Sequence, residues 1–205
     1  MDITTISDSV ISAFHQTSGI EWLIFITALL YVILAGIENS WCWLFGIVAS
    51  ILSVYLCYEG KLFLESGLQL FYIIIGIYGW YQWLHGSKEK TELPIVSFSF
   101  IKNMLLLSIG CILWIPFGYI ANRYSTQVMP YLDGFITAFS LVATWMTTKK
   151  IIENWLYWIV IDALAIVLYA SRGFYLLALL YIIYTLLAAN GYFQWRKKLT
   201  SSVLR

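Results

Sequence analysis

Residues Ile152–Ser171 read IENWLYWIVIDALAIVLYAS. After a polar start the stretch is continuously apolar, apart from Asp162 near its middle, and it has the roughly 20 residues that a helix needs to cross a bilayer. Its apolar residues do not alternate with polar ones at every second position, as they would in a barrel strand. Because a backbone inside lipid must satisfy its own hydrogen bonds, the stretch predicts a membrane-spanning helix.

The composition extends this prediction to the whole chain. Of its 205 residues, 61% are hydrophobic and 11% are charged, whereas soluble domains carry about 25% charged residues. Six further stretches are long and apolar enough to span: Glu21–Ile37, Trp41–Tyr58, Leu62–Leu84, Phe98–Asn122, Tyr131–Thr148 and Phe174–Trp195. We therefore expect an all-α membrane protein with seven transmembrane helices in a single integral membrane domain over residues 1–205.

Lysine and arginine predict the orientation. With the N-terminus outside, nine of the twelve basic residues fall on the cytoplasmic side and three, namely Lys61, Arg123 and Arg172, fall outside. Basic residues concentrate in cytoplasmic loops, so we expect a multi-pass protein of the bacterial inner membrane with a cytoplasmic C-terminus. Six or eight spans would remove most of this asymmetry.

The chain also repeats itself. Glu38-Asn39 precedes a helical pair that ends in GWYQW at Trp83, and Glu153-Asn154 precedes another that ends in GYFQW at Trp195. We predict a first repeat over about 21–84, a linker helix over about 98–122 and a second repeat over about 131–195. An even number of crossings separates matching helices, so this 3+1+3 arrangement gives parallel repeats, as in many transporters.

Asp162 is the first candidate site residue. A carboxylate at mid-bilayer depth costs about 2.5–3.5 kcal/mol on insertion scales, and a partner, water or a cationic substrate must offset that cost. Trp155, Trp158, Asp162, Ala165 and Tyr169 follow helical spacing and share one face. An indole beside a carboxylate suits a flat cation. A structural hydrogen bond or a proton relay for Asp162, and an aromatic core position for Trp158, are the alternatives.

The third predicted span carries a second polar stripe, which adds Glu65, Gln69, Tyr72 and Trp80 to the candidate substrate-binding residues. For Glu65 the alternative is a solvated position at the membrane surface. Trp43 is a further candidate because it follows its Glu-Asn pair at the same distance as Trp158. Counted in the same way, the counterpart of Asp162 is Ile47.

The sequence argues against several other classes of function. His15 and His85 lie outside the predicted spans, and no Walker A or Gly-x-Ser-x-Gly sequence occurs. The three cysteines are widely spaced in apolar stretches, which favours packing over metal binding. The net charge of +1 gives no reason to expect a nucleic-acid partner. We expect no enzyme, no cofactor and no metal, and membrane lipid as the surrounding medium.

With these residues identified, the chain resembles the PnuC family of bacterial nicotinamide riboside transporters. The resemblance rests on Glu153-Asn154-Trp155-Leu156-Tyr157-Trp158, with Asp162 at the family's Asn-or-Asp position, and on the segment from Leu68-Gln69 to Ile77-Tyr78-Gly79-Trp80-Tyr81. It implies a SWEET-like 3+1+3 fold and facilitated diffusion of a flat cationic vitamin, most often nicotinamide riboside. It also implies trapping of the vitamin by a cytoplasmic vitamin kinase and assembly as a homotrimer.

Two residues depart from the family pattern. Nicotinamide riboside carriers often have Asn at the position of Asp162, and some have Asn at the position of Gly76. A thiamine-carrying branch, PnuT, exists in the same family, and thiamine is also a flat cation. A thiamine transporter and the substrate-capture subunit of an ATP-driven vitamin importer are therefore the alternative functions.

Overall fold

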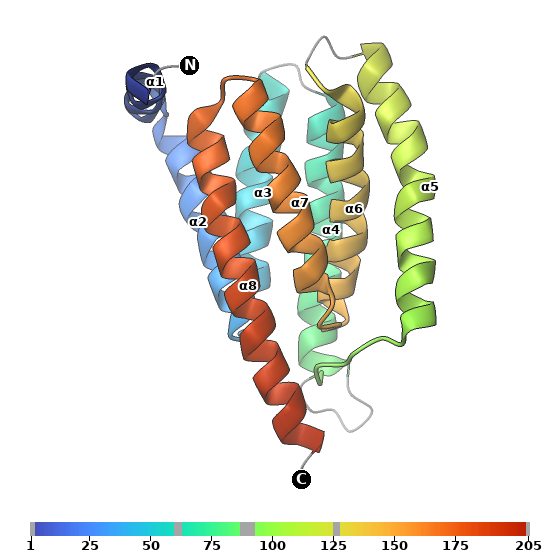
Figure 1. The fold of residues 1–205 in the computed structure, drawn as a ribbon. Coiled ribbons are helices and arrows are strands. Elements are labelled where there is room, and N and C mark those ends of the chain that lie inside the picture. The colour runs from blue at the N-terminus through green and yellow to red at the C-terminus, as the bar shows by residue number, and fades with distance from the viewer. Residues whose placement is uncertain (1–2, 60–62, 87–92, 125–127, 204–205) are drawn as a thin grey trace. The chain divides into compact units, whose positions relative to one another are not determined.

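The computed structural model describes residues 3–59, 63–86, 93–124 and 128–203, and these residues form eight helices (Figure 1). Lys61, Lys88 and Lys90, which contribute to the predicted orientation, lie outside the described residues. The helices are α1 (Ile3–Gln16), α2 (Gly19–Gly36), α3 (Cys42–Glu59), α4 (Phe63–His85), α5 (Phe100–Tyr124), α6 (Pro130–Thr148), α7 (Asn154–Ser171) and α8 (Tyr175–Val203).

Each of the seven predicted stretches is a helix. Five of them, α2, α3, α5, α7 and α8, are long and apolar enough to cross a membrane. The prediction of an all-helical membrane protein is therefore confirmed. Two helices differ from expectation: α1 lies ahead of the first predicted stretch, and α8 continues past Trp195 to Val203.

Large apolar side chains are exposed along these helices, as expected for a surface covered by lipid. Among the most exposed are Ile74, Ile101, Ile112, Ile115, Leu186 and Phe193. A soluble monomer rarely exposes extended apolar surface of this kind. The exposure pattern thus agrees with the composition.

The chain forms two compact units. Unit 1 consists of residues 1–17, 97–144 and 153–189, and unit 2 consists of residues 18–96, 145–152 and 190–205. In unit 1, α5, α6 and α7 pack together (Figure 1) around a cluster of Ala138, Phe139, Ala143 and Ile161. At one end of this unit, Arg172 donates to Asp133 at 2.9 Å.

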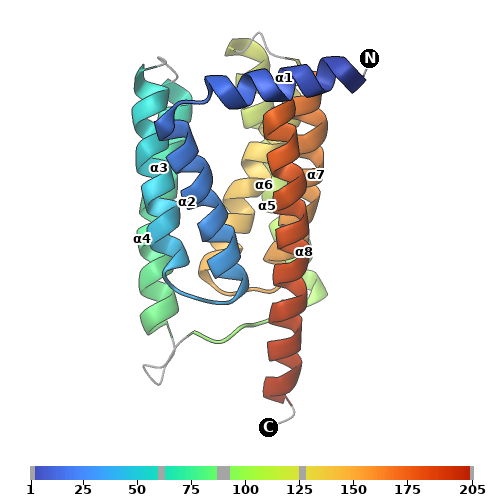
Figure 2. The same cartoon turned by 90° about the vertical axis from the view of Figure 1, so that its left-hand side faces the viewer.

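In unit 2, α2 packs on α3 and α3 packs on α4 (Figure 2). The indole rings of Trp43, Trp83 and Trp195 are buried there and contact one another in series, at 5.6 and 6.0 Å between centroids. Gly79 faces the Trp43 ring so closely that an added Cβ would lie 2.5 Å from it. Only glycine permits this approach between α3 and α4.

Three helices end in the same hydrogen-bond pattern, in which a left-handed residue follows the last turn. Helix α7 uses Gly173 at this position, with φ +79°, as helices commonly do. Helices α2 and α6 use Glu38 and Lys150 instead, with φ of 60° and 48°. Two charged residues thus occupy backbone positions that favour glycine.

Buried positions recur along the chain at a constant spacing of 112 residues, the same spacing that separates Glu38 from Lys150. All four buried residues of α3 have buried counterparts in α7: Cys42 and Asn154, Trp43 and Trp155, Ala49 and Ile161, Ser50 and Asp162. On α4 and α8 the matching buried pairs are Ser66 and Ala178, Gly76 and Ala188, Gly79 and Gly191, Trp83 and Trp195.

This spacing corrects the register inferred from the Glu-Asn pairs. Glu38 follows the end of α2 in a left-handed conformation, whereas Glu153 directly precedes α7 with φ −64°. The two pairs therefore occupy different places, and matching them shifts the helices by three residues. In the register of the helices, the counterpart of Asp162 is Ser50 and not Ile47.

Candidate functional site

Asp162 lies on the buried face of α7. Trp155, Asp162 and Ala165 are buried, and the Asp162 residue is only 4% exposed. Trp158 and Tyr169 are half-buried at the margins of this face. The 3-4-3-4 spacing therefore identified the buried side of this helix.

Two tyrosines of unit 1 lie near Asp162. Tyr181 and Tyr184 of α8 lie within electrostatic reach of its carboxylate. Tyr169 stacks on Tyr181 with ring centroids 5.2 Å apart and planes inclined by 15°. Among the described residues, no ion pair involves Asp162. The carboxylate thus lies among aromatic rings without a basic partner in the described part of the chain.

Tyr181 and Tyr184 were not among the predicted site residues. They are the counterparts, at the spacing of 112, of Gln69 and Tyr72 on α4. Aligning the two halves on Trp83 and Trp195, rather than on the Glu-Asn pairs, would have revealed them. The signal was present in the sequence, but it was read in the wrong register.

Trp158 packs against the cluster formed by Ala138, Phe139, Ala143 and Ile161. This contact agrees with an aromatic core position on its α6 side. Trp155 is the more deeply buried indole of the two and is the counterpart of Trp43. Both indoles lie on α7 within two turns of Asp162.

The remaining predicted residues belong to unit 2. Gln69 and Tyr72 are half-buried on α4, and Tyr72 lies near Tyr31 of α2. Trp80 contacts Trp41 at 5.9 Å between ring centroids. Glu65 falls within α4, but its side chain lies outside the described part of the structure.

Trp43 is enclosed in unit 2. Its ring contacts Tyr31 and Trp83 edge to face, at 5.8 and 5.6 Å between centroids. The backbone of Gly79 also approaches this ring closely, so Trp43 packs where α2, α3 and α4 meet.

The chemistry that Asp162 and its neighbours support is recognition of a flat cation. A carboxylate supplies the charge, and the faces of tyrosine and tryptophan rings attract cations through their quadrupole. Within the described residues, no group of three or more His, Cys, Asp or Glu side chains is placed to hold a metal ion. The arrangement can bind and orient a ligand.

Comparison with known proteins gives consistent matches. The family model described as nicotinamide mononucleotide transporter matches residues 18–197. The nicotinamide riboside transporter PnuC of Escherichia coli (strain K12) is 28% identical over 207 residues, covering 88% of this chain and 86% of that protein. PnuC of Neisseria mucosa is 26% identical over 200 residues, covering 92% and 76%.

A more distant relative and a solved structure extend these matches. The riboflavin/roseoflavin transporter RibM of Streptomyces davaonensis is 21% identical over 161 residues, covering 77% of this chain and 75% of that protein. The crystal structure of the vitamin B3 transporter PnuC superimposes with a TM-score of 0.73 at 22% identity, covering 97% of this chain and 90% of that one. At this identity the superposition shows a common fold.

Proposed function

Since its residues 18–197 match the family model, the chain belongs to the nicotinamide mononucleotide transporter family, and we propose that it carries nicotinamide riboside across the bacterial inner membrane. The resemblance to PnuC proteins is confirmed by this membership. The family is one of multi-pass membrane transporters, so the chain is a transporter and not an enzyme.

The observation that carries the choice of substrate is the buried Asp162 carboxylate among aromatic rings. Nicotinamide riboside presents a flat pyridinium cation, which offsets the cost of that carboxylate. A mononucleotide adds a phosphate whose negative charge opposes a nearby carboxylate. Riboflavin appears in the name of the distant relative RibM. Riboflavin is neutral, so the charge of Asp162 does not favour its binding.

The site belongs to this proposal. Asp162, Trp155 and Trp158 of α7 hold the pyridinium, with Tyr181 and Tyr184 of α8 beside them. Gln69, Tyr72, Trp80, Trp43 and Glu65 are proposed as further substrate-binding residues from the first repeat, where amide and hydroxyl groups suit a carboxamide and a ribose.

The architecture proposed for transport is seven spans in a 3+1+3 arrangement. The recurrence of buried positions every 112 residues supports two parallel three-helix repeats. Helices α2–α4 form the first repeat, α5 is the linker, and α6–α8 form the second. Movement of one repeat against the other exposes a site to either side of the membrane in turn.

The mechanism is passive exchange down the substrate gradient. Asp162 is the one carboxylate near the middle of a predicted span, so no second acidic group is at hand to form a proton relay. Uptake then becomes one-way through a cytoplasmic vitamin kinase that phosphorylates the vitamin. A homotrimer is the assembly that the family resemblance favours.

Thiamine is the second candidate substrate, because Asp162 stands where riboside carriers often have Asn and thiamine is also a flat cation. The two proposals share the site and the mechanism. They differ only in which cation fits between the rings.

Counterflow in liposomes tests these proposals. The purified protein should exchange labelled nicotinamide riboside with no ATP and no ion gradient, and should accumulate it only when a riboside kinase and ATP are sealed inside. Exchange of thiamine instead would favour the PnuT-like reading. Accumulation driven by a pH or sodium gradient without a kinase would contradict passive exchange, and a requirement for a separate ATPase would identify an importer subunit.

A further inference from the structure

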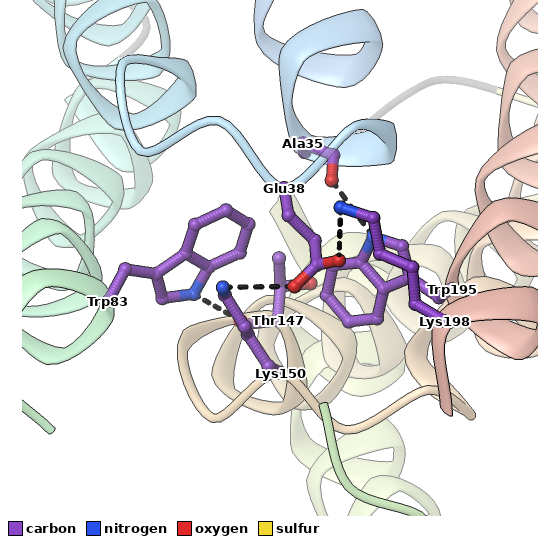
Figure 3. A network of polar contacts seen from close by, with 7 residues as sticks. All are labelled: Ala35, Glu38, Trp83, Thr147, Lys150, Trp195 and Lys198. Atoms are coloured by element: carbon purple, nitrogen blue, oxygen red, sulfur yellow. Dashed lines mark hydrogen bonds and ion pairs between the residues drawn. The ribbon is translucent and has the colours of Figure 1, made fainter. Parts of the chain in front are cut away.

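A charged pair joins the ends of two helices in unit 2 (Figure 3). The Glu38 carboxylate, past the end of α2, accepts from the Lys150 ammonium, past the end of α6, at 3.1 Å. The Lys198 ammonium of α8 reaches the second carboxylate oxygen at 2.9 Å. The three groups form a network that connects the two proposed repeats.

Two indole bonds flank this pair in a reciprocal manner. The Nε1–H of Trp83, from the first repeat, donates to the Thr147 carbonyl at 3.0 Å. The Nε1–H of Trp195, from the second repeat, donates to the Ala35 carbonyl at 3.1 Å. The two donors are 112 residues apart, and so are the two acceptors. An indole from each repeat therefore binds the end of the first helix of the other repeat.

The charged pair is not required to end the helices. Glycine at the same position ends α7 without a side chain, and glycine would remove the backbone cost of a left-handed residue. A buried ion pair also stabilises little more than apolar side chains of similar volume. Glu38 and Lys150 therefore need another explanation than stability.

The Glu38–Lys150 pair is largely shielded from water and lies beside an aromatic ring. Lys150 is 2% exposed and its ammonium lies 4.7 Å from the centroid of the Trp83 ring. The Glu38 side chain is 13% exposed, and Lys198 is 60% exposed. Buried polar pairs are best attested as devices that specify one register or switch between two.

The contacts also break without leaving unsatisfied backbone groups. The Ala35 carbonyl accepts from Glu38 N at 3.0 Å, and the Thr147 carbonyl accepts from Lys150 N at 3.1 Å. Each acceptor keeps this bond when its indole leaves. Because Glu38 and Lys150 lie past helix ends and Lys198 is exposed, water can solvate the three charged groups on separation.

Resting on the proposed transport function, we propose that the Glu38–Lys150 pair, with its two flanking indole bonds, is the cytoplasmic gate of the carrier. The network lies at the end of unit 2 that bears Lys149, Lys150 and Lys198, which the distribution of basic residues assigns to the cytoplasm. The gate is closed in this structure, and it opens and re-forms in every transport cycle.

Cys42 is a native reporter of this gate. It is fully buried at the start of α3, and its sulfur is within electrostatic reach of Lys150. The other two cysteines, Cys57 and Cys111, are more exposed and are replaced by alanine. A positively charged methanethiosulfonate then modifies Cys42 only when water reaches its buried sulfur.

The first measurement is the rate at which this reagent labels Cys42 in the purified protein. Glu38→Gln should raise the rate about tenfold or more, since a hydrogen bond to a charged group contributes about 1.5–3 kcal/mol. Lys197→Gln is the matched control: it removes a charge from the same turn of α8, outside the network, and should change the rate less than about fivefold. Equal rates in Glu38→Gln and the parent would overturn the gate.

The second measurement does not depend on how well Glu38→Gln folds. In a background without native cysteines, Glu38→Cys/Lys150→Cys is joined by a bifunctional thiol reagent whose spacer matches the two removed side chains. Counterflow of nicotinamide riboside should stop on cross-linking and return when the reagent is cleaved by reductant. Unchanged counterflow after complete cross-linking would refute the gate alone. If no vitamin exchanges in any variant, the transport function fails instead, while Cys42 labelling still reports on the pair.

Discussion

At the scale of single residues, Asp162 distinguishes this chain from a generic membrane bundle. Its carboxylate is buried on α7, and the aromatic hydroxyls of Tyr181 and Tyr184 are near enough to interact with it. Burying a charged side chain in the hydrocarbon region of the membrane has a high free-energy cost. Its counterpart Ser50, at the matching position along α3, is also buried but neutral. The proposed pair of repeats is therefore symmetric in packing and asymmetric in charge.

Asp162→Asn should weaken binding of a cationic vitamin more than binding of a neutral analogue of the same shape, such as the reduced riboside. Loss of a charge-assisted contact typically costs about 1.5–3 kcal/mol, and only the cation loses it. Calorimetric titration in detergent measures both affinities. Ser50→Ala is the matched control and should leave the preference for the cation unchanged. An equal loss on both ligands for Asp162→Asn would indicate a structural role for the carboxylate.

Trp158→Ala separates stacking from packing. The indole packs against the α6–α7 cluster, so its removal should lower the unfolding temperature whatever its role in binding. If the ring also stacks on the substrate, affinity for the cation and for the neutral analogue should fall together. Trp158→Phe, which keeps an aromatic face, should restore most of both. If Trp158→Ala lowers the unfolding temperature but leaves both affinities unchanged, Trp158 is a core residue and does not bind the substrate.

At the scale of secondary-structure elements, the ends of α2 and α6 combine a backbone motif with an ion pair. Glu38→Gln leaves the buried Lys150 ammonium without its carboxylate, and breaking a buried pair in this way costs about 3–5 kcal/mol. Glu38→Met/Lys150→Met removes both charges and should recover most of that loss. Thermal unfolding in detergent compares the two variants. A double variant as unstable as the single one would show that the cost lies in the backbone and not in the unpaired charge.

The close approach of α3 and α4 depends on Gly79. In Gly79→Ala the new methyl group would meet the Trp43 ring at 2.5 Å, and overpacking of this kind typically costs about 1–3 kcal/mol. Gly67→Ala on the same helix is the control, because nothing lies within 4 Å of its added Cβ. That variant should gain about 1 kcal/mol of helix propensity. Similar unfolding temperatures for both variants would mean that Trp43 moves aside freely.

At the scale of the whole molecule, orientation follows from the placement of basic residues. Reporter fusions after Gly86 and after Arg205 should both report the cytoplasm, and a fusion at Arg172 should report the outside, because basic residues are retained on the cytoplasmic side. Activity of alkaline phosphatase and fluorescence of a cytoplasmic reporter measure the two locations. If the Arg172 fusion reports the same side as the C-terminus, α8 does not span the membrane.

The sequence alone determined the features that depend on local composition. Long apolar runs place α2 to α7 and the start of α8 within a few residues, because a stretch that avoids water is recognisable from its own side chains. The 3-4-3-4 spacing identified the buried face that carries Trp155 and Asp162. A resemblance over short motifs identified the family. None of these inferences needs to know which helix lies beside which.

Only the tertiary structure decided the features that depend on partners distant in the chain. The sequence offers two registers for the repeats, one from the Glu-Asn pairs and one from Trp83 and Trp195. The left-handed backbone at Glu38 decides for the second, in which Tyr181 and Tyr184 match Gln69 and Tyr72. The continuation of α8 past Trp195 places Lys198 against Glu38. The bond between Glu38 and Lys150 joins residues 112 positions apart. Local hydrophobicity tells which residues leave water, but which charges then meet depends on how the helices pack.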